Sequence, residues 1–420
     1  MRTPRTLGTR RTPHPAWRIA TALGVTQLVG YGVLFYAYGV VTVPMETTFG
    51  WSRAQTSGAF SLALLMSGAA AYPMGRWVDR HGARGLMTAG SVAGAAGIAA
   101  WSFVRDLPGL YLVQAAIGLA LAAVTYEIAF AVVTRWFRWK RVRALLLVTT
   151  LGGLASTVFV PLSTGLVEAV GWRAALRWLA AGLALITVPL HAGVVRRAPD
   201  ARTRDADAPT PLDATGGEAP EERSVAVRDA LRDPRFGWLT TAFSLDRLAV
   251  VAIGVHAVPL LLERGHAPAL VAAAAGSIGL MQVAGRLAFG AAAEASSLAA
   301  LAALTYLVRA ASLASLLLAP DAVAVWSFAA LFGLANGAST LARAGLLAET
   351  FGPAHYGAIS GSVSAVIALL QTGAPLAVGA LRAATGDYRL ALLLLAVAGV
   401  GAAAAVRRGA RAPGGAAPAG

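Results

Sequence analysis

The chain alternates long apolar runs with short polar gaps along almost its whole length. Each run has about 20 or more mostly apolar residues, the length that an α-helix needs to cross the ~30 Å hydrocarbon core of a bilayer. The expected fold class is therefore an all-α membrane protein with about twelve transmembrane helices in two sets of six. The predicted helices lie near 19–44, 53–75, 85–104, 108–134, 143–168 and 173–194, then near 236–262, 267–291, 297–318, 322–349, 356–383 and 388–406.

A polar stretch separates the two sets. Residues 196–235 are charged and rich in Pro, Ala and Gly, so this stretch cannot bury apolar surface and is expected to be a cytoplasmic linker. Its last part, SVAVRDALRD, is expected to form a short amphipathic helix on the membrane surface. The predicted organisation is a basic N-terminus at 1–18, a first half at 19–195, the linker at 196–235, a second half at 236–406 and a tail at 407–420.

Composition supports the membrane assignment. With 57% hydrophobic and 13% charged residues, 420 positions offer too little polar surface for a soluble globule. The net charge of +15 comes from arginines that cluster in alternate gaps, which is the positive-inside pattern and argues against nucleic acid as a partner. Both termini are therefore expected in the cytoplasm, and the protein is expected in the inner cell membrane. The first apolar run is too long for a signal peptide, whose apolar core has about 7–15 residues.

An internal repeat relates the two halves. Positions 215 apart carry the same unusual residues, such as Pro44 and Pro259, and acidic residues at 79 and 294 coincide in the same register. Two parallel six-helix repeats joined by a linker are typical of transporters in which one half rocks against the other around a central site. No GxxxxGK[ST] phosphate-binding loop occurs, so the chain carries no ATPase site of its own.

The gap after the second predicted helix has the sequence GRWVDRHGAR and resembles the signature G-x-x-x-D-R-x-G-R/K-R of the major facilitator superfamily. The matching residues are Gly75, Asp79, Arg80, Gly82 and Arg84, whereas Ala83 stands where a basic residue is usual. A carboxylate ringed by arginines at a helix end can form charge-assisted bonds that hold one conformation and break in the other. In the second half, Gly290 and Glu294 keep the glycine and the acid without the basic cluster, which predicts an asymmetric gate.

The wider sequence is similar to the branch of this superfamily with monocarboxylate porters and oxalate/formate exchangers. The resemblance rests on the stretch WFRWKRVRALLLVTTLGG and on Gln282 and Arg286 in the eighth predicted helix. It implies that Arg286 binds a substrate carboxylate, and the guanidinium offers a planar fork for this purpose. Gln282 replaces the acid of that branch and Lys140 is the only lysine, so this route of proton coupling is in doubt. The alternative for Arg286 is extension to the cytoplasmic surface.

Three other titratable residues in apolar runs are candidates for proton coupling, because ionisable groups in lipid need a partner or a cavity. Glu127 either takes up a proton or pairs with Arg309 or Arg343. Asp246 either faces the cavity or is neutralised by its neighbour Arg247 near the cytoplasmic interface. His256 titrates in the useful range, or is a packed helix histidine.

Six uncharged polar or aromatic residues are candidates to line a central cavity: Gln27, Tyr31, Tyr36, Tyr126, Asn336 and Gln371. Tyr31 and Gln371 are favoured because the first and eleventh helices line the cavity in the family that the chain resembles.

The leading hypothesis is a secondary active transporter for a small organic anion such as a monocarboxylate, working by proton symport or by anion exchange. The alternatives are a drug or metabolite efflux antiporter and, from another class, a non-transporting membrane sensor or scaffold. No Ser/His/Asp set, histidine cluster or acidic pair at metal spacing lies on one helix face, so neither an enzyme nor a metal or other cofactor is expected. The expected partners are the substrate, the lipid bilayer and, for symport, a proton, with the chain acting as a monomer.

Overall fold

The structure is a computed structural model that describes residues 15–196, 224–318 and 321–412. The described residues of the first half form α1 (Pro15–Tyr31), the π-helical turn η1 (Gly32–Tyr36), α2 (Ala37–Phe49), α3 (Arg53–His81), α4 (Ala83–Trp101), α5 (Leu107–Val124), α6 (Tyr126–Trp136), α7 (Arg141–Gly153) and α8 (Ala155–Gly193). Those of the second half form α10 (Val227–Arg232), α11 (Pro234–Glu263), α12 (Pro268–Ala292), α13 (Leu298–Leu318), α14 (Ala322–Phe351), α15 (Tyr356–Thr372), α16 (Ala374–Thr385) and α17 (Arg389–Arg411).

The described helices are consistent with the twelve predicted spans. Within residues 15–196, 224–318 and 321–412, nine segments are long and apolar enough to cross a membrane by length and composition alone. With α3 and α4 added and α8 divided at Gly171, the arrangement is consistent with twelve. Large apolar side chains such as Leu185 and Leu318 are exposed on the outside of the helices, which suits contact with hydrocarbon rather than with water.

The repeat seen in the sequence recurs in the backbone. Residues 215 positions apart adopt the same special conformation: Gly50 and Gly265 have positive φ, Gly171 and Gly386 have positive φ, and the Asp106 and Asp321 side chains both cap the helix that follows them. Positive φ is easy only for glycine, so these glycines end helices where the chain must turn at the bilayer surface. The two halves are therefore built on one plan.

Several spans are interrupted, which the apolar pattern did not reveal. The fourth predicted helix divides into α5 and α6 at Thr125, whose extended backbone (φ −84°, ψ −172°) breaks the helix. A break leaves carbonyl groups without helical partners, and these are costly in a membrane. The Gln27 amide donates to the Val124 carbonyl oxygen at 2.7 Å and so satisfies one of them.

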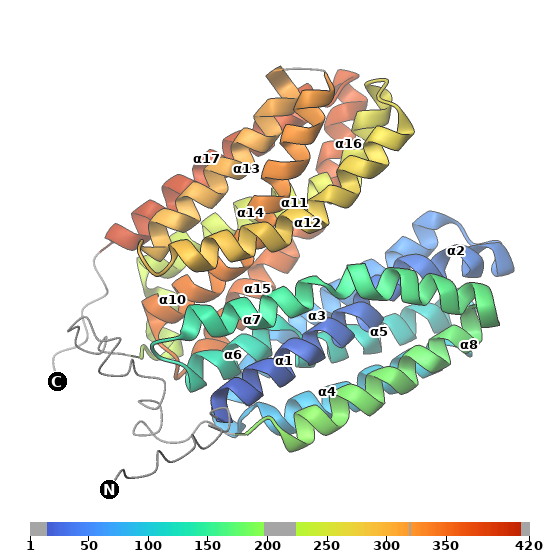
Figure 1. Ribbon diagram of the computed structural model, residues 1–420, viewed down its shortest axis with the longest axis horizontal. Coiled ribbons are helices and arrows are strands. Elements are labelled where there is room, and N and C mark those ends of the chain that lie inside the picture. Colours follow the sequence, from blue (N-terminus) through green and yellow to red (C-terminus); the bar gives the residue numbers. More distant parts are fainter. Residues whose placement is uncertain (1–14, 197–223, 319–320, 413–420) are drawn as a thin grey trace, which may run out of the picture.

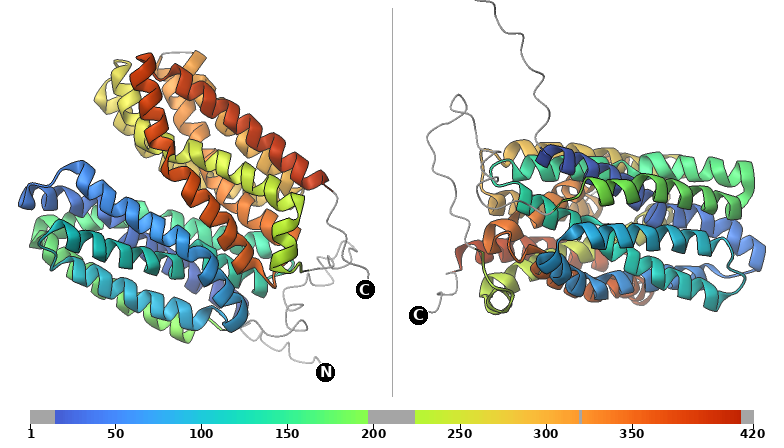
Figure 2. Two further views of the ribbon diagram at one scale, coloured as in Figure 1. Left: turned by 180° about the vertical axis from the view of Figure 1, so that it is seen from behind. Right: turned by 90° about the horizontal axis from the view of Figure 1, so that it is seen from below.

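The two halves form a V in projection (Figure 1). They meet at the end where α1 begins, α3 ends and α15 begins, which we call the closed end, and they separate toward the ends of α2 and α16, which we call the diverging end. Figure 2 shows the same arrangement from behind and from below. The contacts between the halves include those of α3 with α15 and of α7 with α12.

Candidate functional site

A cavity of about 360 Å³ lies between the two halves, and its wall takes residues from both. Seven of the eight residues expected to bind substrate or line the cavity lie in this wall: Tyr31, Tyr36, Tyr126, Gln282, Arg286, Asn336 and Gln371. Gln27 does not line it, and its amide binds the Val124 carbonyl oxygen instead. The rings of Tyr31 and Tyr126 pack together with centroids 4.8 Å apart. Helix packing thus joins side chains as distant in the chain as Tyr31 and Gln371.

Arg286 lies on α12 in the cavity wall and is almost completely buried, with 5% of its surface exposed. Among the described residues, its Nε and Nη1 have no hydrogen-bond partner. The guanidinium packs on Gly153 of α7, where an added Cβ would overlap it. The side chain therefore does not extend to the cytoplasmic surface, and a buried guanidinium without a counter-ion is a site that favours an anion.

Arg247 is a second guanidinium in the cavity wall, where its Nε donates to Gln371 Oε1 at 3.1 Å. The suggestion that Asp246 and Arg247 neutralise each other near the interface is wrong. Both lie near the middle of α11, and adjacent helical residues point about 100° apart. Asp246 pairs instead with Arg309 of α13, whose Nε lies 2.5 Å from Asp246 Oδ1.

Glu127 projects from the first turn of α6 and forms an ion pair with Arg343 of α14. This settles the choice between Arg309 and Arg343 that the sequence left open. Ser360 donates to the second carboxylate oxygen at 2.6 Å, and Arg343 donates to Ser364 Oγ at 2.6 Å. The carboxylate belongs to the first half and all of these partners belong to the second.

Ser360 and Ser364 were not among the residues expected from the sequence. Their spacing of four residues places both hydroxyls on one face of α15, and this was the available signal. The spacing does not say which helix that face meets.

His256 is placed away from this wall. One ring nitrogen lies 3.2 Å from the Tyr388 hydroxyl and the other 2.9 Å from the Pro375 carbonyl oxygen. His256 is not among the residues that line the cavity, so its surroundings fit the packed-histidine interpretation.

The charges of the cavity wall do not cancel. Its guanidinium groups belong to Arg247, Arg286 and Arg343, and its carboxylates to Glu127 and Asp246. Both carboxylates already have a guanidinium partner, one of which is outside the wall at Arg309. Among the described residues, Arg247 and Arg286 therefore have no carboxylate partner, and the cavity has a surplus of positive charge.

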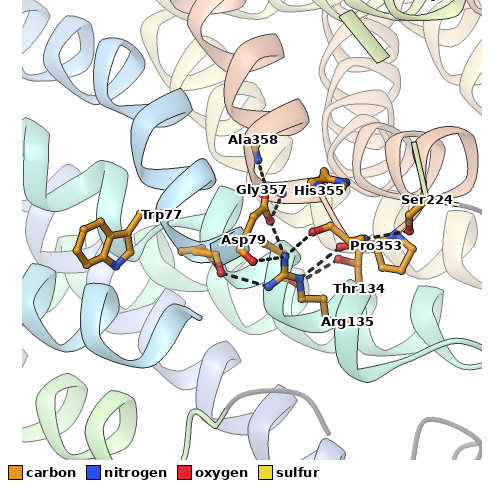
Figure 3. Close-up of polar contacts among 12 residues, drawn as sticks. Trp77, Asp79, Thr134, Arg135, Ser224, Pro353, His355, Gly357 and Ala358 are labelled. Carbon is orange, nitrogen blue, oxygen red and sulfur yellow. Dashed lines mark hydrogen bonds and ion pairs between the residues drawn. The ribbon is translucent and has the colours of Figure 1, made fainter. Parts of the chain in front are cut away.

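At the closed end, the Asp79 carboxylate joins the two halves (Figure 3). It accepts from the backbone N–H of Gly357 at 3.1 Å and of Ala358 at 2.7 Å, and from Arg135 Nη2 at 2.8 Å. The first N–H groups of a helix lack helical partners and carry a partial positive charge, so Asp79 caps α15 from the opposite half. Arg135 also donates to the Ala354 carbonyl oxygen at 2.6 Å.

The other residues of the predicted gate motif have different surroundings. A Cβ at Gly75 would overlap the Gly357 carbonyl, so this glycine permits the close crossing of α3 and α15. Gly82 has φ 85° and separates α3 from α4. Arg80 and Arg84 are exposed at the closed end.

Residues 23–320 match the sequence family described as the Major Facilitator Superfamily. The chain belongs to this superfamily.

Relatives within the superfamily include two named monocarboxylate transporter 11. The human protein is 30% identical over 308 residues, which cover 67% of this chain and 59% of the relative. The mouse protein is 31% identical over 230 residues, which cover 51% of this chain and 49% of the relative. The oxalate:formate antiporter of Oxalobacter formigenes is 26% identical over 228 residues, which cover 53% of this chain and 50% of the antiporter. The chain thus spans about half to six-tenths of the length of these relatives.

Solved superfamily structures share the fold. The E. coli fucose:proton symporter has a TM-score of 0.72 at 13% identity and covers 94% of this chain and 99% of its own. The human organic anion transporter MFSD10 has a TM-score of 0.71 at 14% identity, and the match covers 94% of this chain and 100% of the MFSD10 chain. Family and fold together make the chain a multi-pass membrane protein of the Major Facilitator Superfamily.

A second charged contact closes this major facilitator protein at the same end. Arg143 Nε and Nη2 donate to the Glu294 carboxylate at 2.5 and 2.9 Å, and Gly290 packs on Leu146. Position 143 is related by the 215-residue repeat to position 358, whose backbone Asp79 binds. Asp79 and Glu294 thus contact equivalent positions of the opposite halves. Glu294 binds the Arg143 guanidinium, and Asp79 binds the N-terminal N–H groups of α15.

The end of the interhalf linker holds the loop between α14 and α15. Val225 N–H donates to the Phe351 carbonyl oxygen at 3.0 Å, and Ala354 N–H donates to Ser224 Oγ at 3.2 Å. Ala354 is therefore held from one side by Ser224 of the linker and from the other by Arg135.

We expect Asp79→Asn to weaken the closed end more than Glu294→Gln. The Asp79 side chain is 5% exposed, and hydrogen bonds to a charged group contribute about 1.5–3 kcal/mol, or roughly 10- to 150-fold in the balance between conformations. The exposed Arg143–Glu294 pair contributes less. Because the chain has no cysteine, spin labels at Ala89→Cys and Ala300→Cys would report the separation of the halves by pulsed electron spin resonance. An equal effect of both variants would contradict the expectation.

The Glu294 contact also predicts a pH dependence. The hydrogen bond from Arg143 holds the pKa of the Glu294 carboxyl below its usual value. The stabilisation from this pair is therefore present at neutral pH and is lost as the pH falls through the lowered pKa. In the labelled protein, Glu294→Gln should remove this acid-dependent part of the opening. An unchanged acid response in Glu294→Gln would show that the pair does not stabilise the closed end.

We expect Gly75→Ala to separate α3 from α15 at the closed end, because the new Cβ would overlap a backbone carbonyl that cannot move aside alone. Gly85→Ala is the matched control, since nothing lies within 4 Å of a Cβ at that position. The same pair of labels should show a longer distance in Gly75→Ala and an unchanged one in Gly85→Ala. Identical distances in the two variants would refute the close-crossing role of Gly75.

Proposed function

We propose that this transporter carries a small organic anion and that Arg286 binds its carboxylate. The observation that supports this most is the buried guanidinium of Arg286, which lines the cavity between the halves without a carboxylate partner among the described residues. A charged group in a low-dielectric site is stabilised by an opposite charge, and a guanidinium matches a carboxylate in shape and in hydrogen bonding. The substrate would supply that charge.

Neighbouring side chains are suited to orient such an anion. Gln282 lies one helical turn before Arg286 and offers an uncharged amide donor. Arg247, held by Gln371, adds a second positive charge to the same cavity. The surplus of positive charge makes the cavity unfavourable for a cationic drug and so argues against that form of the efflux alternative.

The relatives support the same class of substrate. Two are named as monocarboxylate transporters and one as an oxalate:formate antiporter, and both names describe transport of carboxylates. We propose the same class for this chain, driven either by proton symport or by exchange with another anion.

We propose that the closed end faces the cytoplasm and that the chain lies in the inner cell membrane as a monomer. The arginine-rich gaps at 76–84, 135–143 and 407–411 all belong to the closed end, as the positive-inside pattern requires. The cavity is then reached from the outside through the diverging end. Rocking of the halves would close that end, open the other and expose the cavity to the cytoplasm.

We expect Arg286→Ala to weaken binding of the transported carboxylate by roughly 10- to 150-fold, because a hydrogen-bonded charge is lost. Arg286→Lys should recover only part of this, since lysine keeps the charge without the planar fork. The measurement is a thermal-shift titration of the purified protein with a panel of mono- and dicarboxylates, followed by uptake of the best ligand into proteoliposomes. Arg382→Ala is the matched control, because Arg382 pairs with Glu263 away from the cavity wall. If no carboxylate stabilises the wild type, or if Arg286→Ala binds as well as the wild type, the proposal fails.

A further inference from the structure

Charged pairs in this structure differ in whether they join the two halves. Asp246–Arg309 and Glu263–Arg382 each lie within the second half, so a rigid rocking motion leaves them intact. Glu127–Arg343 joins the first half to the second, as the contacts of Asp79 and Glu294 do. Of these three contacts between halves, Glu127–Arg343 is the one whose two residues line the cavity.

The Glu127 carboxylate is bound by the opposite half through both of its oxygens. Oε1 pairs with Arg343 and Oε2 accepts from Ser360 at 2.6 Å. About a quarter of each charged side chain, 23% for Glu127 and 24% for Arg343, is exposed to the cavity, so both a proton and a soluble ligand can reach the pair. The pair is therefore stable while ionised and accessible to what would break it.

The break between α5 and α6 places this carboxylate. Glu127 lies in the first turn of α6, directly after the extended residue Thr125. A continuous helix would give position 127 another orientation and would remove the free N-terminus, whose partial positive charge favours the anion. The interruption of this span thus has a consequence for charge as well as for shape.

The other groups around Glu127 leave Arg343 as its charged partner. Tyr31 from α1 and Tyr356 from α15 interact with it electrostatically, and Tyr126 precedes it on α6. The α3 residues of the cavity wall are uncharged: Leu64, Ser67, Gly68 and Ala71. Those of α5, α7 and α8 are uncharged too, and the remaining charged wall residues are Asp246 and Arg247 of α11 and Arg286 of α12.

We infer that Glu127 and Arg343 form a proton-controlled lock between the halves. A proton that enters from the diverging end adds to the Glu127 carboxylate, which becomes a neutral acid and loses its ion pair with Arg343. Loss of this pair removes one of the three contacts between the halves and so shifts the balance toward separation at the closed end. After release of the proton on the other side, the carboxylate pairs with Arg343 again and the lock is restored.

The lock also couples the proton to an anion, and this part rests on the proposed function. When Glu127 is neutral, Arg343 joins Arg247 and Arg286 as a guanidinium without a carboxylate, so the cavity gains one more uncompensated positive charge. A bound carboxylate replaces the charge that protonation removed. Proton and anion therefore favour each other's binding, and by linkage the effect is equal in both directions. The lock thus favours proton symport.

The conformational half of the inference can be tested without any substrate. With spin labels at Ala89→Cys and Ala300→Cys, the wild type should shift toward a separated closed end as the pH falls. Glu127→Gln should be more separated than the wild type at neutral pH and should keep only the part of the acid response that the Arg143–Glu294 pair provides. Glu263→Gln is the matched control, since it neutralises a carboxylate whose ion pair lies within one half. A wild type that does not respond to pH, or a Glu127→Gln protein that responds as the wild type does, would overturn the lock.

A milder variant keeps the test decisive if Glu127→Gln fails to fold. Ser360→Ala removes one hydrogen bond to the carboxylate and leaves the ion pair in place. At neutral pH the separated conformation should then gain population by roughly 10- to 150-fold, because a hydrogen bond to a charged group is lost. An unchanged population would contradict the lock.

Transport assays separate this inference from the proposed function. In proteoliposomes, Glu127→Gln should lose at least tenfold of the uptake driven by a pH gradient and should keep exchange of labelled for unlabelled carboxylate. Loss of both activities in a protein that is correctly folded would refute coupling through Glu127. If no carboxylate is carried by the wild type but the acid response depends on Glu127, the lock stands and the proposed substrate class fails.

Discussion

The compensation of charge in a low-dielectric interior is the constraint on which this structure depends. Each carboxylate in the cavity wall is matched by a guanidinium, Glu127 by Arg343 and Asp246 by Arg309. Two further guanidinium groups, Arg247 and Arg286, have no such match among the described residues. Arg286 is almost completely buried, and an isolated charge away from water is costly, so its unmatched charge supports the proposed anionic substrate.

At the closed end, a buried charge is also compensated, here by backbone N–H groups as well as by a guanidinium. Asp79 lies almost buried where two helices cross, and it is stabilised by a guanidinium together with the unpaired N–H groups of α15. The close approach that makes this contact available depends on Gly75 and Gly357, whose backbones would be held apart by side chains. Sterics and electrostatics therefore act together at one crossing, and a change in either should open it.

The two halves share a scaffold but not a chemistry. Turning glycines and capping aspartates recur at the same positions of the repeat, so both halves place their helices alike. The repeat partner of Arg286 is Ala71, whose backbone lies against Gly361 where α3 crosses α15. The partner of Glu127 is Ala342, a buried residue of α14. At each of these two pairs of repeat positions, one half has a small packed alanine and the other has a charged residue. The charged residues of the cavity wall are therefore not repeated between the halves.

The sequence by itself determined the helical spans and the repeat, because apolar length, special backbone residues and rare polar groups in lipid are local properties. The gate motif and several of the residues expected in the cavity came from the resemblance of the sequence to a known family. Only the tertiary structure decided the partners. Asp246 is paired with a residue 63 positions away and not with its neighbour, and Glu127 with one 216 positions away. Which ion pairs form depends on which helix faces meet and on where a span is interrupted, as at Thr125. Neither is encoded in the periodicity of a single helix, and so the distinction between charges within one half and charges that join the two halves emerges only when the halves are packed together.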